Sequence, residues 1–319
     1  MKKIGILTSG GDAPGMNSCI RSIVFAAEKL GIDCFGILRG YDGLIDGELI
    51  TLSKSKVNHI ISHGGTILKT ARSNRFMTNE GRKLAFDSYK KMGLEGLIVI
   101  GGDGTYKGAK VFQDEFNVPI IGIPGTIDND LFGTDYTIGY DTAINTAMKA
   151  IDQLRDTAQS HNRIFFVEVM GNDAGLIAVR SGLAAGAEDI HIPEIKTDLN
   201  TIYNKIANKE KDESLIIVVS EGDEFNTIDL AKMAKSKFPN VEIKTLILGH
   251  LQRGGSPTAF DRLLSSRFGI LAVQSIQSGK SGFATCIVNG QVQLIEIEKV
   301  NKHLNYLKPH LLEMMDFFC

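Results

Sequence analysis

Two short glycine-containing segments, residues 101–105 (Gly-Gly-Asp-Gly-Thr) and 124–130 (Pro-Gly-Thr-Ile-Asp-Asn-Asp), carry the side chains best suited to chemistry. Between them they supply three carboxylates, Asp103, Asp128 and Asp130. Glycine lets the backbone approach an anion closely, and a helix that follows offers unpaired N–H groups, so the combination suits a polyphosphate. Carboxylates near phosphate repel it unless a cation intervenes. We therefore expect one of them to hold Mg²⁺ and another to act as a general base.

Each segment alone also has a simpler explanation. Glycine-rich turns between a strand and a helix occur in many α/β proteins that bind no phosphate, and Asp-Asn-Asp can be a turn stabilised by its own side chains. However, each segment follows an apolar run, 97–100 or 120–123, that is typical of a buried strand in a parallel sheet. Ligands bind at the carboxyl ends of such strands. Two carboxylate-bearing turns at neighbouring strand ends therefore favour a functional site.

The rest of the chain alternates between strand and helix patterns. We expect strands at 3–7, 34–38, 164–169, 214–219 and 242–248, and helices at 16–30, 79–92, 141–160 and the C-terminus. Residues 283–288 and 291–296, joined by Asn289-Gly290, predict a hairpin with a type I′ turn. Residues 40–43 predict a turn, and Asn79 and Asp141 are expected helix N-caps. This order predicts an α/β fold of two Rossmann-like lobes with mainly parallel sheets and a cleft between them.

Composition limits the class of protein. Of the 319 residues, 43% are hydrophobic and 23% are charged, which is typical of a soluble globular enzyme. The net charge of −2 argues against nucleic acid as the main partner, and no apolar run approaches the ~20 residues that span a bilayer. The four cysteines lack a Cys-x-x-Cys spacing, so we expect reduced thiols and a cytoplasmic protein.

Four motifs together give a resemblance to a known family. Besides 101–105 and 124–130, the chain carries Gly-Gly-Asp-Ala-Pro-Gly-Met-Asn at 10–17 and Gly-His-Leu-Gln-Arg-Gly-Gly-Ser-Pro at 249–257. With these motifs the chain resembles the bacterial ATP-dependent 6-phosphofructokinases over nearly its whole length. The segment 101–105 alone also resembles NAD kinases and lipid kinases, whereas 124–130 together with 249–257 does not.

The resemblance implies a reaction and an assembly. The reaction is phosphoryl transfer from ATP to the 1-hydroxyl of D-fructose 6-phosphate with Mg²⁺, the committed step of glycolysis, giving fructose 1,6-bisphosphate and ADP. An ATP-binding lobe would comprise residues 1–138 and about 251–301, and a fructose-6-phosphate-binding lobe 139–250 and about 302–319. The family further implies a homotetramer whose active sites are shared between subunits.

Individual roles follow from the same resemblance. Asp128 is the implied base, Asp103 the Mg²⁺ ligand, and Thr126, Gly11 and Arg72 are further catalytic residues. The implied nucleotide-binding residues are Gly11, Tyr41, Arg72, Ser73, Gly102, Asp103, Gly104 and Thr105. The implied sugar-phosphate-binding residues are Thr126, Ile127, Asp128, Arg163, Met170, Gly171, Asn172, Glu221, Lys244, His250, Leu251, Gln252 and Arg253. Arg163 and Lys244 would reach in from a neighbouring subunit.

Two substitutions separate this active site from the usual one. Asn172 stands where the family usually has an arginine that stabilises charge on the phosphoryl group, and Lys244 also replaces an arginine. An amide carries no charge, and an ammonium lacks the bidentate fork of a guanidinium. We therefore expect either compensation by another cation or slower turnover, and weaker binding of the sugar phosphate.

A second, intersubunit site for ADP or phosphoenolpyruvate is also part of the resemblance. Its candidate residues here are Arg21, Phe25, Lys54, Arg155, Gly186, Glu188 and Lys211. Phe25 replaces an arginine, and three acids lie within 208–213, where carboxylates would repel a bound phosphate. We expect this site to bind effectors weakly.

Three alternatives to this function remain open: a pyrophosphate-dependent relative, an NAD kinase-like enzyme, and a non-catalytic sugar-phosphate or nucleotide sensor. Pyrophosphate-dependent relatives usually carry bulkier residues where this chain has Gly104 and Gly125, which favours ATP. Retention of Asp103 and Asp128 argues against a sensor.

Overall fold

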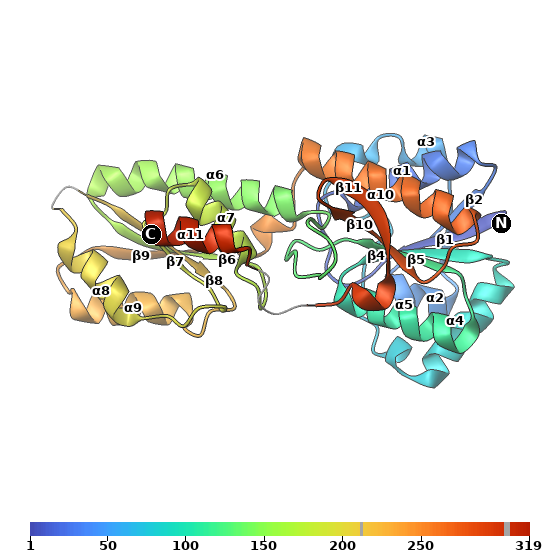
Figure 1. The fold of residues 1–319 in the computed structure, drawn as a ribbon, viewed down its shortest axis with the longest axis horizontal. Helices are drawn as coiled ribbons and strands as arrows, with labels where there is room; N and C mark the ends of the chain where they lie inside the picture. The colour runs from blue at the N-terminus through green and yellow to red at the C-terminus, as the bar shows by residue number, and fades with distance from the viewer. Residues whose placement is uncertain (211–212, 303–306) are drawn as a thin grey trace. The chain divides into compact units, whose positions relative to one another are not determined.

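The computed structural model describes residues 1–210, 213–302 and 307–319 (Figure 1). The chain divides into two compact units. Unit 1 comprises Met1–Ile127, Leu131–Thr142 and Arg253–His303, and unit 2 comprises Asp128–Asp130, Ala143–Gln252 and Leu304–Cys319. Each unit is therefore assembled from segments that are far apart in the sequence.

Unit 1 is built on a seven-stranded sheet in the order β11-β10-β5-β4-β1-β2-β3. The strands are β1 (Lys3–Thr8), β2 (Asp33–Ile37), β3 (Leu49–Leu52), β4 (Gly96–Gly101), β5 (Ile120–Pro124), β10 (Phe283–Val288) and β11 (Gln291–Glu296). The pairs from β10 to β2 are parallel, and the two edge pairs are antiparallel. Because β5, β4 and β1 are parallel neighbours, the loops at their carboxyl ends lie at one edge of the sheet.

Helices cover both faces of this sheet (Figure 1). They are α1 (Met16–Lys29), α2 (Gly40–Asp46), α3 (Lys54–Val57), α4 (Asn79–Lys91), α5 (Asp103–Phe116) and α10 (Ala259–Gln277). Helices α1 and α10 pack against each other on one face, and α2, α4 and α5 lie on the other. An apolar core that includes Tyr41, Phe76 and Phe112 fills the space under α2, α4 and α5. Burial of this apolar cluster stabilises the layer.

Unit 2 contains a parallel sheet in the order β7-β8-β6-β9. Its strands are β6 (Ile164–Val169), β7 (Asp189–His191), β8 (Leu215–Ser220) and β9 (Ile243–Ile247). Its helices are α6 (Tyr140–His161), whose first turn begins in unit 1, α7 (Leu176–Ala184), α8 (Leu199–Asn208), α9 (Thr227–Lys237) and α11 (Pro309–Phe318). All six residues of β8 are buried, as expected for an apolar run at the centre of a parallel sheet.

The predicted α/β class is confirmed, and several element predictions coincide with the structure. The strand at 164–169 and both hairpin strands have the expected bounds. Asn289 and Gly290 have φ values of 50° and 76°. Both lie in the left-handed region that a type I′ turn requires.

Three local predictions are wrong. Residues 40–43 are not a turn but open α2, because Tyr41, Leu44 and Ile45 recur at helical spacing and are buried. The N-cap of α4 is Thr78 rather than Asn79, since the Thr78 hydroxyl accepts the N–H of Gly81 at 3.0 Å. Asp141 does not cap α6, which already begins at Tyr140.

Three of the four cysteines lie in the core. Cys19, Cys34 and Cys286 are buried free thiols, and burial raises the pKa of Cys34 and of Cys286 to about 12. They therefore fill the core as protonated apolar groups.

Over the described part of the chain, none of the helices has the length and apolar character needed to cross a membrane.

Candidate active site

Three loops of unit 1 meet at the carboxyl ends of β1, β4 and β5. The backbone N–H of Ser9 donates to the carbonyl of Ile100 at 3.0 Å, and the Thr105 hydroxyl donates back to the carbonyl of Ser9 at 3.1 Å. On the other side, the N–H of Gly125 donates to the carbonyl of Gly101 at 3.0 Å. These bonds join the loop after β4 to both of its neighbours.

The residues that the sequence singled out in these loops therefore lie close together. A Cβ built on Gly102 would lie 3.7 Å from the Cβ of Thr126, and one on Gly10 would lie 3.7 Å from the hydroxyl of Thr105. Gly104, in the first turn of α5, is exposed, whereas the side chain of Thr105 is buried. The N-terminus of the 14-residue helix α5 faces this edge and favours a negatively charged ligand.

Asp103 is the first residue of α5, and its carboxylate has two partners. One oxygen accepts the backbone N–H of Lys302 at 3.0 Å, and the other lies 2.6 Å from the ammonium of Lys107. In the described residues, no group of three or more His, Cys, Asp or Glu side chains is placed to hold a metal. Mg²⁺ bound through phosphates and water needs only one or two carboxylates. Asp103 is partly exposed at the carboxyl edge of the sheet, so this one carboxylate fits a metal ion that binds together with a nucleotide.

The segment of the second motif crosses between the two units. Ile127 is 2% exposed, so only its backbone is available to a ligand. Asp128 follows Thr126 by two residues and is half-buried, whereas Asn129 and Asp130 are buried. Of the two aspartates after Ile127, Asp128 is the one that solvent, and hence a substrate, reaches.

Tyr41 lies in the core rather than on the surface of the loops. It is 4% exposed and stacks on Phe76 with ring centroids 4.0 Å apart. Its hydroxyl donates to the carbonyl of Thr105 at 2.7 Å. Tyr41 therefore holds the first turn of α5 from the side of the core.

Arg72 and Ser73 differ in their surroundings. Arg72 is exposed, so its guanidinium is accessible to phosphate. The Ser73 hydroxyl instead forms a hydrogen bond with the Asp42 carboxylate and accepts the N–H of Phe76 at 3.1 Å. Ser73 thus stabilises the turn that follows Arg72.

Two residues without a sequence-based role hold the loop that leads to Arg72. The Asn17 side chain donates to the carbonyl of Gly64 at 3.0 Å and accepts the N–H of Ile67 at 2.8 Å. The Thr70 hydroxyl donates to the carbonyl of Gly10 at 2.6 Å. Asn17 closes the motif at 10–17, which is the signal that could have identified it. Thr70 has no such signal.

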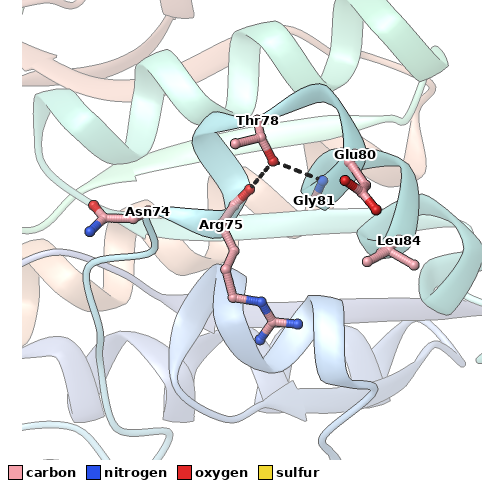
Figure 2. A pocket seen from close by; sticks show the side chains of 6 residues that line it. All are labelled: Asn74, Arg75, Thr78, Glu80, Gly81 and Leu84. Atoms are coloured by element: carbon pink, nitrogen blue, oxygen red, sulfur yellow. Dashed lines mark hydrogen bonds between the residues drawn. The ribbon is translucent and has the colours of Figure 1, made fainter.

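A hollow of about 390 Å³ lies beside the turn that follows Arg72. Figure 2 shows its six lining residues: Asn74, Arg75, Thr78, Glu80, Gly81 and Leu84. Arg75 extends toward α2, where its guanidinium donates to Asp46 at 2.9 Å. This hydrogen bond is the main reason why the pKa of Asp46 is lowered. The hollow contains none of the predicted site residues, so it is separate from the strand-end loops.

In unit 2, Glu221 organises the segment that contains Asn172. One carboxylate oxygen of Glu221 accepts the backbone N–H groups of Gly171 at 3.2 Å and Asn172 at 2.8 Å. Asn172 has a φ of 53°, a left-handed conformation that asparagine tolerates better than most residues. Met170 beside it is buried. Sequence reasoning listed these four residues together, and the structure brings them together.

Arg163 and Lys244 also lie together in unit 2, because both contact Glu242. The guanidinium Nε of Arg163 is 2.9 Å from one carboxylate oxygen, and the ammonium of Lys244 is 3.2 Å from the other. The hydrogen bond from Arg163, followed by that from Lys244, lowers the pKa of Glu242. Two cations around one carboxylate leave this surface with a positive balance.

The segment 249–253 is divided between the units. His250 and Leu251 are exposed within the 3₁₀ turn Gly249–Gln252 of unit 2, and Gln252 is buried and donates to the carbonyl of Gly249 at 3.2 Å. Arg253 belongs to unit 1, where its guanidinium lies against Gly11. Arg253 therefore belongs to unit 1, whereas Arg163 and Lys244 belong to unit 2.

The residues predicted for the second, intersubunit effector site contact other residues of their own unit. In unit 1 the Arg21 guanidinium lies 4.1 Å from the centroid of the Phe25 ring, and the ammonium of Lys54 is 2.9 Å from Glu28. In unit 2, Arg155 pairs with Glu188 at 2.7 Å, and it also donates to the carbonyl of Gly186. Lys211 lies outside the described residues.

Comparison with known proteins agrees with this geometry. A family model described as phosphofructokinase matches residues 3–276. The ATP-dependent 6-phosphofructokinase of Cytophaga hutchinsonii is 49% identical over 295 residues, which cover 92% of this chain and 90% of that protein. The ATP-dependent 6-phosphofructokinase 2 of Bacteroides thetaiotaomicron is 47% identical over 318 residues, covering 99% and 98% respectively.

A solved structure extends the comparison to the fold. Phosphofructokinase from Saccharomyces cerevisiae superimposes with a TM-score of 0.88 at 32% identity, over 94% of this chain and 45% of that longer chain. The strand-end loops, the two-unit α/β architecture and these matches lead to one conclusion: the chain belongs to the phosphofructokinase family.

Proposed function

We propose that this chain transfers the γ-phosphoryl group of ATP to the 1-hydroxyl of D-fructose 6-phosphate, giving fructose 1,6-bisphosphate and ADP as the committed step of glycolysis. The observation that carries the proposal is the meeting of the loops after β1, β4 and β5, which gathers Gly11, Gly102 and Thr126 at one edge of the unit 1 sheet. Family membership and the names of the relatives support the same reaction.

Unit 1 is the proposed nucleotide-binding lobe. The backbone at Gly11 and Gly102 and the N-terminus of α5 would bind the phosphates, and exposed Arg72 would add charge. Within the described residues, a Cβ on Gly104 would meet no heavy atom within 4 Å, so this surface is open to a nucleotide. Asp103 would hold Mg²⁺, which when bound neutralises charge on the β- and γ-phosphates.

Asp128 is the proposed general base. It would take the proton of the 1-hydroxyl as that oxygen bonds to the γ-phosphorus, while the bond from this phosphorus to the β–γ bridging oxygen breaks and ADP leaves. Its half-buried position allows contact with a substrate while limiting water. The Thr126 hydroxyl, two residues earlier, would hydrogen-bond the phosphoryl group or the sugar.

Unit 2 is the proposed sugar-phosphate-binding lobe. Glu221 would accept hydrogen bonds from the sugar hydroxyls, and exposed His250 would contribute to binding of the 6-phosphate. Arg163 and Lys244, held together by Glu242, would serve the active site of a neighbouring subunit in a cytoplasmic homotetramer. A shared surface of this kind accounts for two cations gathered at the exposed end of one carboxylate.

One coupled assay tests the reaction. Purified protein with Mg²⁺ and fructose 6-phosphate should form fructose 1,6-bisphosphate with ATP, and its kcat/KM with pyrophosphate should be negligible. Comparable kcat/KM values for the two donors, or no turnover with ATP, would contradict the proposal. Omission of the donor is the control for background.

Subunit mixing tests the shared site. Arg163→Ala and Asp128→Asn should each be nearly inactive alone. Hybrids formed by dissociating and reassociating a mixture should regain activity, because some sites then combine an intact Asp128 with an intact Arg163. If the mixture stays as inactive as its components, Arg163 acts within its own subunit.

A further inference from the structure

Strand β7 of unit 2 carries two buried polar side chains that the proposed function does not use. Asp189 and His191 lie two residues apart, and hence on the same face of the strand, and they are 6% and 7% exposed. One carboxylate oxygen of Asp189 lies 3.1 Å from Nε2 of His191, and the other is 2.9 Å from the ammonium of Lys205 in α8. Burial alone would raise the pKa of Asp189, but the hydrogen bond with His191 and the charge of Lys205 lower it. The His191 ring is therefore fixed by an ionised carboxylate.

Thr197 lies between this pair and the loop that follows β8. It immediately precedes the N-cap of α8 and is 7% exposed. Its hydroxyl oxygen lies 3.5 Å from Nδ1 of His191 and donates its proton to the carboxylate of Asp223 at 2.8 Å. Its backbone N–H donates to the carboxylate of Glu224, also at 2.8 Å. Thr197 thus gives two hydrogen bonds to charged groups that lie 26 and 27 residues later in the chain.

The loop that Thr197 holds begins with Glu221. The backbone N–H of Asp223 donates to the carbonyl of Ser220 at 3.0 Å, which closes a turn around Glu221 and Gly222. A Cβ on Gly222 would clash with the carbonyl oxygen of Asn172, so the turn touches this segment backbone to backbone. Glu221 in turn accepts the N–H of Asn172 at 2.8 Å. The placement of Asp223 therefore influences the placement of Glu221.

We propose that Thr197 is a positioning residue for Glu221 and through it contributes to binding of the sugar phosphate. The proposal rests on the proposed function, which assigns the sugar hydroxyls to Glu221. Thr197 holds Asp223, and the turn 220–223 transmits this restraint to the carboxylate of Glu221. Glu221 itself is exposed, so its side chain has more conformations to lose on binding when the turn is not anchored. Ordering a side chain and a loop during binding weakens affinity.

Thr197→Val and Thr197→Ser form the matched pair of variants. Valine keeps the branched shape but lacks the hydroxyl that donates to Asp223, whereas serine keeps the hydroxyl. Thr197→Val should raise the KM for fructose 6-phosphate roughly tenfold, the lower end for one hydrogen bond to a charged group. Its kcat and its KM for ATP should stay within about twofold, because only binding of the sugar is affected. Thr197→Ser should stay within about twofold in all three constants.

Thr227→Val is the control for loss of a buried hydroxyl near the same loop. Thr227 is the first residue of α9 and is 1% exposed, and its hydroxyl has no hydrogen-bond partner among the described residues. This variant should change neither KM.

Amide hydrogen exchange without any ligand tests the positioning independently of the reaction. The N–H of Asn172 donates to Glu221, so its exchange reports how firmly the carboxylate is held. Exchange in the segments 170–173 and 221–225 should be several-fold faster in Thr197→Val than in Thr197→Ser. Exchange in α5 of unit 1 should be the same in both variants.

Two outcomes would overturn the proposal. If Thr197→Val matches Thr197→Ser in exchange and in the KM for fructose 6-phosphate, the hydroxyl does not hold the turn. If Thr197→Val instead changes kcat and both KM values together, Thr197 only stabilises the fold. Thr197→Ala also lacks the hydroxyl and replaces Thr197→Val if that variant does not fold. The expected difference in exchange, found in a protein that does not phosphorylate fructose 6-phosphate, would contradict the proposed function and support the positioning of Glu221.

Discussion

Thr142 donates two hydrogen bonds to the carboxylate of Asp261, one from its backbone N–H at 2.8 Å and one from its hydroxyl at 2.5 Å. The other oxygen of Asp261 accepts the N–H of Gly139 at 2.9 Å. Asp261, from the first turn of α10, thus caps the N-terminus of α6. In return Thr258, the N-cap of α10, donates to Asp141 in the first turn of α6 at 2.6 Å. Asp261 therefore takes the capping role at α6 that the sequence assigned to Asp141, while α10 is capped by its own Thr258.

This buried carboxylate makes stability depend on pH. Burial raises the pKa of Asp261 to about 6 despite these hydrogen bonds, above the value of about 3.9 in an unfolded chain. The folded state therefore binds the proton more tightly between these values, and the contribution of Asp261 to stability falls as pH rises from 4 through 6. Two pKa units correspond to about 3 kcal/mol.

We predict that Asp261→Asn removes this slope, since an amide does not titrate. Thermal unfolding of both proteins at pH 4.5, 5.5, 6.5 and 7.5 provides the measurement. The difference in Tm between the two proteins should change across this range and favour the variant more at the upper end. A difference that does not vary with pH would show that Asp261 is ionised throughout.

Asp128→Asn should lower kcat by roughly 10²–10⁴-fold, the range of a general base. The KM for fructose 6-phosphate should change far less, because the amide preserves the shape of the side chain. Asp114→Asn is the control, because Asp114 is an exposed carboxylate of α5 paired with Lys110, and it should retain full activity. A kcat for Asp128→Asn within a few-fold of the parent would assign the base elsewhere.

If a missing cation limits turnover, Asn172→Arg should raise kcat several-fold. The upper limit is the factor of roughly 10²–10³ that one such donor contributes. ATP affinity should be nearly unchanged. The φ of 53° at this position imposes a cost of about 1–2 kcal/mol on arginine, and Asn172→Gln imposes a similar cost without a charge. If Asn172→Arg is no faster than Asn172→Gln, the charge is already supplied by another residue.

The second, intersubunit site should bind ADP and phosphoenolpyruvate weakly, and the two effectors should change the reaction rate little. Phe25 removes a cation, while Arg21 packs on its ring and Lys54 pairs with Glu28. Each lost charged hydrogen bond is worth ~1.5–3 kcal/mol, so two losses predict a hundredfold weaker affinity or more. Initial rates at sub-saturating fructose 6-phosphate should stay nearly constant as either effector reaches millimolar concentration. Several-fold inhibition by phosphoenolpyruvate that ADP reverses would show an intact site, and Phe25→Arg should increase any response.

The strands were predictable because local sequence determines them. Apolar runs predicted β4, β5 and β6 to within a residue, and the turn chemistry of Asn289-Gly290 predicted the hairpin. The short edge strand β3 was missed because only Leu52 of its four residues is buried. Its sequence, Leu-Ile-Thr-Leu, does not alternate apolar and polar residues, so it carries no period-2 signal.

The surroundings of the site residues were less predictable, because they depend on tertiary packing. The sequence indicated that Glu221 and Asn172 belong to one site, but it contained no sign that the carboxylate accepts the N–H of Asn172. Likewise, a tyrosine after a strand can face solvent or core, and only the stack on Phe76 decides for Tyr41. The contact between Gly11 and Arg253 joins residues 242 positions apart in the numbering, beyond the reach of any local pattern.

The seven-stranded sheet has a consequence for how the protein is made on the ribosome. Strand β5 pairs on one side with β4, but its other neighbour, β10, lies more than 150 residues later in the chain. Until β10 has emerged, β5 presents an open edge that another chain could pair with. All of the intervening unit 2 segment is synthesised during that interval. Chains that stall between the two strands would therefore be especially prone to aggregation and dependent on chaperones.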